Sequence, residues 1–211
     1  MQPTLSFQVH PHLPSQLENL NRLAGNLWFT WNPEAVELFQ RIDQGIWSNV
    51  SHNPRALLNQ ISQERLDALA RDNGFVAQLE RVVDLMDSYL SAEGCPFLAG
   101  RAPEDLKIAY FSAEYGLSDC LPVYSGGLGM LSGDHLKSAS NLNLPLVAVG
   151  LAYRQGYFSQ YLNPDGWQQE AYHANDFYNM PMELVRDDQG QELTISVDIE
   201  GRPLVARIWK V

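Results

Sequence analysis

The sequence predicts an all-helical N-terminal domain followed by an α/β part. Apolar residues recur at three- and four-residue steps through residues 13–91, as they do on the buried face of a helix. From residue 107 onward, short apolar runs alternate with helix-like and polar stretches, which is the order typical of α/β folds. Residues 93–106 carry glycine, proline and charge, and we interpret them as a linker. We therefore place the helical domain at residues 1–97 and the α/β part at 98–211.

Each expected helix of the first domain has its own starting signal. The first apolar stripe comprises Leu17, Leu20, Leu23, Ala24, Leu27 and Trp28. Asn32 and Pro33 then form a cap followed by proline in the first helical turn, and residues 51–54 start another helix in the same style. Ser62 is the expected cap of a further helix, which Gly74 separates from the last one, at residues 75–90.

Three tryptophans of this domain, Trp28, Trp31 and Trp47, allow two interpretations. Aromatic faces pack well on sugar rings, so the three side chains could form a stacking site. Aromatic residues at helical spacing are more often core residues, and this is the interpretation that we favour.

The α/β part is expected to begin with a strand, a helix and a second strand. Residues 107–111 predict a buried strand, residues 128–141 a helix, and residues 146–151 a continuous apolar strand of the parallel type. Residues 157–162 and 167–172 flank Asn163-Pro-Asp-Gly166, which predicts a hairpin turn.

The last part of the sequence predicts further strands. Apolar and polar residues alternate through 193–199, Gly201-Arg-Pro203 is expected to turn the chain, and residues 204–211 begin another strand. The strands are too few for a complete doubly wound sheet. We therefore expect the chain to be the front portion of a longer protein.

Composition narrows the classes of partner and compartment. A formal net charge of −11 argues against nucleic acid and anionic membrane surfaces as partners. The first residues lack a basic start followed by an apolar core, and no apolar run approaches the roughly 20 residues that span a bilayer. Cys95 and Cys120 do not form a Cys-x-x-Cys pair. We expect a cytoplasmic protein with two free thiols, with a single disulfide left open.

A glycine loop, residues 125–129, carries the main functional signal. Gly126 and Gly127 directly precede the helix-like residues 128–141, and Gly129 lies at their start. We expect the three glycines to allow positive φ angles and bare amides. A helix that begins there directs unpaired N–H groups and the positive end of its dipole at an anion. The spacing fits neither the dinucleotide-binding pattern nor a P-loop. A plain strand-to-helix connection without a ligand is the alternative.

Longer motifs around the loop extend this interpretation. They are residues 109–116, 121–129, 133–140, 149–160 and 165–169. In this order, and without large gaps between about residues 107 and 181, the sequence resembles the α-glucan phosphorylases, which include the glycogen, starch and maltodextrin phosphorylases.

The resemblance implies a fold, an activity and a cofactor. Members have a glycosyltransferase-B fold of two Rossmann-like lobes, of which this chain would supply part of the first. They release glucose 1-phosphate from α-1,4-glucan with inorganic phosphate, and they use pyridoxal phosphate bound to a lysine in the second lobe. The expected partners are therefore glucan and phosphate, and a homo-oligomer is left open.

The resemblance also assigns site residues. The amides of Gly126, Gly127, Leu128 and Gly129 would face the phosphate and the glucosyl unit, and Glu114 matches a glutamate in the vicinity of the active site. An ordinary solvated carboxylate is the alternative for Glu114.

Some positions depart from the family pattern. Ser125 and Met130 differ from the animal-type members and fit the bacterial branch, which puts animal-type phosphorylation and nucleotide control in doubt. The motif of the cofactor lysine is absent, since Lys107, Lys137 and Lys210 lie in other contexts. More loosely, residues 26–33 resemble an extra helical domain that precedes the catalytic part in that bacterial branch and has no assigned chemistry.

The histidines do not indicate a metal site. His10, His12, His52 and His173 lack companions at metal-ligand spacing, so we expect no bound metal. Asp134 and His135 are adjacent on the expected helix and point in different directions, which favours structural roles over an acid–base dyad.

Two other functions remain open beside the phosphorylase. A nucleotide-sugar-dependent glucan synthase shares the architecture and a Gly-Gly-Leu-Gly loop, but such enzymes usually carry lysine shortly before the glycines, where this chain has Tyr124 and Ser125. A non-catalytic glucan-binding module is the second alternative. As half of a two-sided site, the isolated chain is expected to be inactive.

Overall fold

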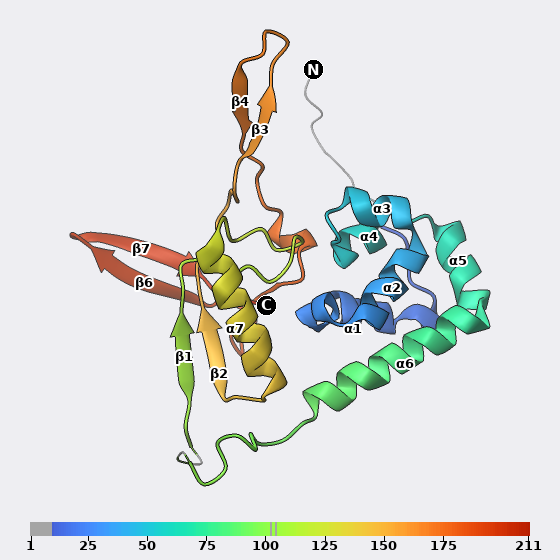
Figure 1. Ribbon diagram of the computed structural model, residues 1–211, viewed down its shortest axis with the longest axis horizontal. Helices are drawn as coiled ribbons and strands as arrows, with labels where there is room; N and C mark the ends of the chain where they lie inside the picture. Colours follow the sequence, from blue (N-terminus) through green and yellow to red (C-terminus); the bar gives the residue numbers. More distant parts are fainter. Residues whose placement is uncertain (1–9, 102, 104) are drawn as a thin grey trace. The chain divides into compact units, whose positions relative to one another are not determined.

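A computed structural model describes residues 10–101, 103 and 105–211 of the chain (Figure 1). The chain divides into two compact units, Met1–Leu90 and Ser91–Val211. This division falls a few residues before the domain boundary that we expect after residue 97, which stays a prediction.

The first unit is helical throughout its described residues, as the apolar periodicity predicts. Its elements are the 3₁₀ helices η1 (Ser15–Leu17) and η2 (Leu27–Trp31) and the α-helices α1 (Asn19–Ala24), α2 (Pro33–Ile42), α3 (Gln44–Asn49), α4 (Pro54–Gln60), α5 (Gln63–Arg71) and α6 (Asn73–Leu90).

Side-chain caps begin these helices where the sequence predicts them. The Asn32 side chain accepts the backbone N–H of the third residue along at 3.1 Å, ahead of Pro33 in the first turn of α2, and Ser62 caps α5 in the same way. The expected break at Gly74 is wrong by two residues. Asp72 separates α5 from α6, and its side chain accepts the N–H groups of Gly74 and Phe75 in the first turn of α6.

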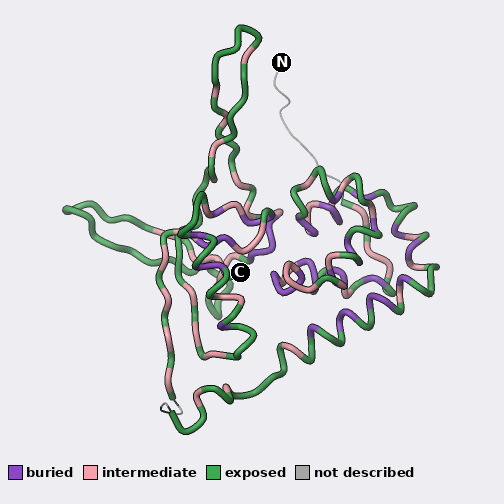
Figure 2. The backbone as a smooth tube through the Cα atoms, viewed as in Figure 1, coloured by how far each residue is buried: buried purple, intermediate pink, exposed green. Residues whose placement is uncertain are grey.

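The core of this unit contains two of the three tryptophans. A sugar-stacking site would require their rings to be exposed. Trp47 is 2% exposed, stacks on Phe39 at 5.6 Å and meets Phe29 edge-on. Trp28 is 4% exposed, and Trp31 is half-buried. Figure 2 shows buried positions recurring along the helices, with exposed positions between them. The buried state of Trp28 and Trp47 supports the core interpretation.

The second unit starts with a strand, a helix and a strand. Strands β1 (Ile108–Phe111) and β2 (Leu146–Val149) pair in parallel, with Ile108 opposite Leu146, and helix α7 (Gly127–Asn141) connects them. The parallel pairing is the predicted one. Parallel strands need such a crossover, because their ends lie at opposite edges of the sheet.

The expectation that β1 is buried is wrong. Residues of both strands alternate between half-buried and exposed, and Phe111 is 72% and Val147 66% exposed. His135 of α7 packs its ring on Tyr110 of β1, so α7 covers the other face of the strand pair. Among the described residues only two strands form this sheet, and its second face carries the exposed side chains of Phe111, Val147 and Val149.

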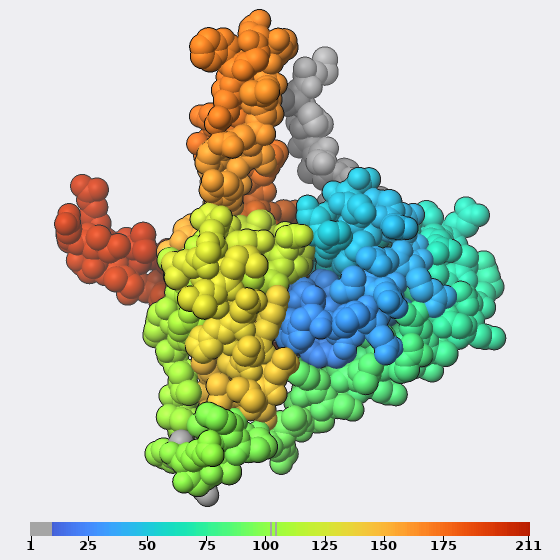
Figure 3. All heavy atoms as spheres, viewed as in Figure 1, coloured from blue at the N-terminus to red at the C-terminus, as the bar shows by residue number. Residues whose placement is uncertain are grey.

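Two antiparallel hairpins project from the remainder of the second unit (Figures 1 and 3). Strand β3 (Ser159–Leu162) pairs with β4 (Gln168–Ala171), and the Asn163 side chain accepts two backbone N–H groups within the connecting turn, as predicted. Strand β6 (Thr194–Ile199) pairs with β7 (Arg202–Arg207). The short strands β5 (Glu183–Leu184) and β8 (Trp209–Lys210) also pair, and η3 spans Phe177–Asn179.

The turn that we expect at residues 201–203 is misplaced. Glu200 and Gly201 make the turn, with φ of 52° and 79°, while Arg202 and Pro203 already belong to β7. Positive φ at both central residues is the geometry of a two-residue hairpin turn, which matches the twist of the strands. The expected strand at 204–211 is also divided between β7 and β8.

Candidate functional site

The glycine loop lies where α7 begins, after the chain has left β1. Gly126 is the N-cap residue of α7 and Gly127 its first residue. An N-cap side chain normally accepts an N–H group of the first turn, but glycine has none to offer. The first turn of α7 therefore needs an acceptor from elsewhere in the chain.

Glu114 supplies this acceptor from the segment that follows β1. One oxygen of its carboxylate accepts the backbone N–H of Ser125 at 2.6 Å and lies 3.2 Å from the Ser125 hydroxyl. The other oxygen accepts the N–H of Gly129 at 3.1 Å. Glu114 thus replaces the missing cap side chain. Its negative charge also lies at the positive end of the helix dipole, which is favourable.

These contacts lower the pKa of the Glu114 carboxyl from its ordinary value. The hydrogen bond from the Ser125 N–H is the largest cause, and the Ser125 hydroxyl and the N–H groups of Gly129 and Gly126 act in the same direction. Partial burial opposes them. The carboxyl is therefore ionised at neutral pH and is poorly suited to donate a proton.

Two of the loop amides keep no partner in the described part of the chain. The N–H groups of Gly127 and Leu128 stand in the first turn of α7, where no helix carbonyl can reach them, and both residues are exposed. Of the four predicted amides, those of Gly126 and Gly129 are directed at Glu114 instead. Gly127 and Leu128 are the pair that a bound oxygen atom could reach.

Close packing, and not an unusual backbone conformation, explains the glycines. None of the three adopts the positive φ that glycine allows, since Gly126 is extended with φ of −150° and neither Gly127 nor Gly129 has a positive φ. A Cβ atom on Gly129 would lie 2.6 Å from the Cβ of Tyr124, whereas a Cβ on Gly126 or Gly127 would meet no atom within 4 Å. Gly129 is thus required by packing, and the other two keep the start of α7 bare.

Sequence reasoning missed the close approach that holds Glu114 and α7 together. A Cβ on Gly133 would lie 2.1 Å from the carbonyl oxygen of Gly116, and the Gly116 N–H donates to the Gly129 carbonyl at 2.7 Å. Ser132, which is fully buried, donates its hydroxyl to the Glu114 carbonyl at 2.6 Å. A glycine inside a helix is costly, and Gly133 was the signal that could have indicated this contact.

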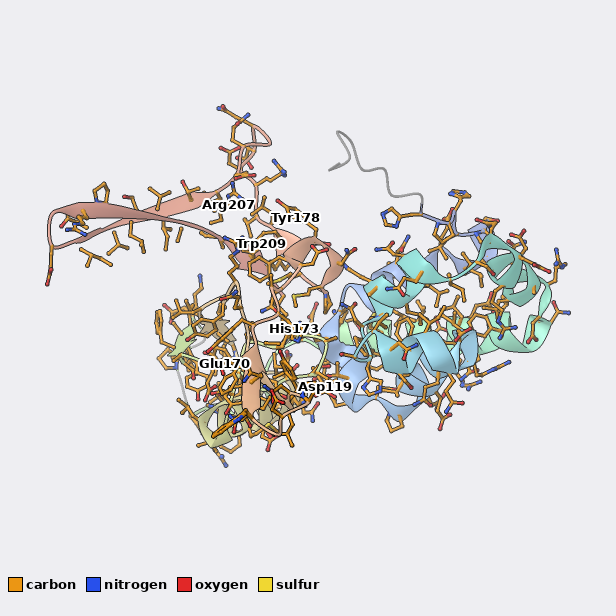
Figure 4. The ribbon with its side chains drawn as sticks, turned by 90° about the horizontal axis from the view of Figure 1, so that it is seen from above. Asp119, Glu170, His173, Tyr178, Arg207 and Trp209 are labelled. Carbon is orange, nitrogen blue, oxygen red and sulfur yellow. The ribbon has the colours of Figure 1, made fainter. Side chains whose placement is uncertain are left out.

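Asp134, His135 and His173, which the sequence also singled out, are not among the residues that hydrogen-bond to Glu114. His135 packs on Tyr110, which supports a structural role, and Asp134 is exposed. His173 follows β4 and is exposed, and Figure 4 shows it apart from Tyr178 and Trp209, whose rings meet at 5.3 Å. Within the described residues, no group of three or more His, Cys, Asp or Glu side chains is arranged to hold a metal ion.

None of the three lysines belongs to the segment that forms the glycine loop. Lys107 precedes β1, Lys137 lies in α7 beyond its first turns, and Lys210 lies in β8. A Schiff base to pyridoxal phosphate needs a lysine amine, and none of the three belongs to residues 112–129. The loop segment itself therefore offers no amine for the covalent attachment of that cofactor.

The family described as "Protein of unknown function (DUF3417)" matches residues 13–121, which is about half of the chain. The chain belongs to this family. It also matches the N-terminal portion of the glycogen and maltodextrin phosphorylases, as the motifs predict.

Three relatives show the extent of the similarity. The glycogen phosphorylase of Mycobacterium tuberculosis (strain H37Rv) is 43% identical over 96% of this chain and 24% of its own length. The maltodextrin phosphorylase of Thermococcus litoralis is 39% identical over 99% of the chain and 25% of its own length. The glycogen phosphorylase of Aquifex aeolicus is 37% identical over 92% of the chain and 27% of its own length. No solved structure matches the chain significantly. The chain thus spans about a quarter of the length of these relatives.

Proposed function

We propose that this chain is the front part of an α-glucan phosphorylase, which releases glucose 1-phosphate from α-1,4-glucan with inorganic phosphate. The observation that carries the proposal is the similarity to three phosphorylases over 92–99% of the chain, helical domain included. The glycine loop supports it, because two free amides at the start of α7 suit phosphate or sugar oxygens.

In this proposal the glycine loop binds the substrate oxygens, and Glu114 holds the loop in its conformation. The amides of Gly127 and Leu128 donate to oxygens of phosphate or of the glucosyl unit, and Gly126 leaves room for the ligand to approach. Such fixed donors stabilise developing charge without reorganising during the reaction. Glu114, ionised and engaged with backbone amides, lies in the vicinity of the reaction without donating the proton that the leaving glucan needs.

We further propose that residues 98–211 form the first part of a Rossmann-like lobe of a glycosyltransferase-B fold. The parallel β1–β2 pair with its crossover helix supports this assignment. So does the exposed apolar face of Phe111, Val147 and Val149, because parallel sheets normally have both faces covered. The lobe would be completed by polypeptide that this chain does not contain.

The cofactor and the partners follow from the same proposal. Pyridoxal phosphate would be held by a lysine outside this chain, and its phosphate would assist proton transfer. Glucan and phosphate are the proposed substrates, in a cytoplasmic enzyme whose oligomeric state is open. None of the helices in the described part of the chain combines the length and the apolar character of a membrane-spanning segment.

Of the two alternatives, a glucan synthase is disfavoured by Ser125 and Tyr124 before the glycines and by the names of the relatives. A non-catalytic module remains the second candidate. It is favoured only if the 211 residues occur as a separate protein in the cell.

A direct assay separates the three functions. The product of the complete gene is incubated with maltodextrin and phosphate, or with maltodextrin and ADP-glucose, and glucose 1-phosphate and chain extension are measured. We expect glucose 1-phosphate from the first mixture only, and none from the isolated 211-residue chain. Chain extension from ADP-glucose alone would establish the synthase, and retention on an amylose column without either activity would establish the binding module.

A further inference from the structure

The direction in which Glu114 points is set by the two peptide groups that flank it. One of them contains the carbonyl of Ala113 and the other the carbonyl of Glu114 itself. Because a peptide group is planar and rigid, fixing both carbonyls fixes the Cα–Cβ bond between them. Whatever holds these two carbonyls therefore fixes the direction in which the side chain leaves the backbone, and so helps to keep the carboxylate within reach of the glycine loop.

Helix α7 holds the second of the two carbonyls. The buried hydroxyl of Ser132 donates to the Glu114 carbonyl at 2.6 Å, and the Ser112 hydroxyl donates to the same oxygen at 2.9 Å. Ser132 stands on the helix whose first turn the carboxylate caps. The backbone and the side chain of Glu114 are thus tied to one element.

Tyr153 holds the first carbonyl from a different part of the chain. Its hydroxyl donates to the Ala113 carbonyl at 2.8 Å, across 40 residues of sequence. Tyr153 follows β2, and its own carbonyl accepts the side-chain N–H of Asn175 at 2.8 Å, so it is anchored at its backbone as well. Tyr153 makes no hydrogen bond to the glycine loop or to the Glu114 carboxylate.

We infer that Tyr153 is a positioning residue of the proposed site: its hydroxyl orients the Ala113 peptide so that the Glu114 carboxylate stays on the amides of Ser125 and Gly129. The free amides of Gly127 and Leu128 then keep their place at the start of α7. For catalysis, this inference rests on the proposed function. For the geometry of the loop, it stands on the contacts alone.

The test removes one oxygen atom, through Tyr153→Phe. The control is Tyr161→Phe, because Tyr161 lies on β3, is 55% exposed, and its hydroxyl makes no hydrogen bond within the described residues. The chain is labelled with ¹³C at its glutamate carboxyls, and the Glu114 signal is assigned by its loss in Glu114→Gln. The pKa of Glu114 is then measured by NMR in each variant, and urea unfolding is followed on the same samples.

We expect the pKa of Glu114 to rise toward its ordinary value in Tyr153→Phe and to stay unchanged in Tyr161→Phe, with Tyr153→Phe still folded. If Tyr153→Phe only lowers the stability and leaves the pKa of Glu114 in the folded chain unchanged, Tyr153 is a plain stabilising residue and the inference is overturned. In a second variant, Ser132→Ala, the pKa of Glu114 is also expected to rise.

Activity of the complete gene product separates this inference from the proposed function. There, Tyr153→Phe is expected to raise KM for phosphate about three- to tenfold, the usual effect of losing one hydrogen bond, with a smaller change in kcat. A shifted pKa of Glu114 in a gene product without phosphorolysis would support the positioning role and refute the phosphorylase. If the gene product shows phosphorolysis, but Tyr153→Phe changes neither the pKa of Glu114 nor KM, the phosphorylase is supported and the positioning role is refuted.

Discussion

The carboxylate of Glu114 accepts the backbone N–H of Gly129, fifteen residues further along, at 3.1 Å. The same carboxylate accepts the N–H of Ser125, so one side chain joins the segment after β1 to the start of α7. Glycine at the N-cap of α7 keeps the helix end bare, and Glu114 replaces the side chain that this position lacks. The arrangement leaves two amides free without leaving the helix end uncapped.

Replacing Glu114 by glutamine should make the stability of the chain less dependent on pH. The folded-state pKa of Glu114 is lowered from 4.5, so the ionised carboxylate stabilises the folded chain above that value, and this contribution is lost as the pH falls through the lowered pKa. Glu114→Gln should therefore be less stable than the parent near about pH 7, with the difference shrinking toward about pH 3. Urea unfolding at both pH values measures it. If the two proteins differed in stability by the same amount at both pH values, the ionised carboxylate would not hydrogen-bond to the loop amides.

Two glycines of α7 should respond oppositely to alanine. In Gly133→Ala the new methyl group would lie 2.1 Å from the Gly116 carbonyl oxygen, so the variant should lose about 1–3 kcal/mol or more. In Gly127→Ala the methyl group meets no atom within 4 Å, and the variant should gain about 0.4–1 kcal/mol, because the unfolded chain loses freedom.

The same alanine at Gly127 tests the proposed site. In the complete gene product it should lower phosphorolysis, because the methyl group stands beside the free amides. A variant that is both more stable and fully active would place the ligand elsewhere.

The tryptophan at the centre of the helical unit should matter for stability and not for glucan. Trp47→Ala should cost about 3–5 kcal/mol in the free energy of unfolding, because it empties a fully packed aromatic cluster. Trp167→Ala, at a position that is 72% exposed, is the control and should change stability little. If maltodextrin changed the tryptophan fluorescence of the folded chain and Trp47→Phe abolished that change, the core interpretation would fail.

The two cysteines, both free, should differ in reactivity. Cys120 is buried, and burial raises the pKa of its thiol to about 11, so it should react slowly with a thiolate-directed reagent at mildly alkaline pH. Cys95 is only half-buried and should react faster. Mass spectrometry of partially labelled chain measures the two rates, and urea should abolish the difference. Equal rates in the folded chain would contradict the buried position of Cys120.

Local signals in the sequence predicted the local parts of the fold. Asn32-Pro33 and Asn163-Pro-Asp-Gly166 act within a few residues of themselves, and both occur in the structure as expected. Gly201 misled the prediction because it is the second residue of the turn. Pro203 is tolerated in β7, because β6 is the single partner of that strand among the described residues.

The sequence patterns did not predict the long-range contacts. The motif indicated Glu114, but its role as the cap of α7 depends on a contact across eleven to fifteen residues that no periodicity encodes. The hydroxyl of Tyr153 reaches Ala113 across a still longer separation. The exposure of Phe111 could not be read from an apolar run, because such a run does not say how many layers cover the strand.

Whether these residues form the first part of a longer phosphorylase is tested most directly by the intact mass of the protein that carries them in its native source. We predict a mass about four times the 23.8 kDa of this chain, because the chain spans 24–27% of its phosphorylase relatives. A mass of 23.8 kDa would contradict the proposal, since a protein of that size lacks the cofactor lysine and the second half of the site.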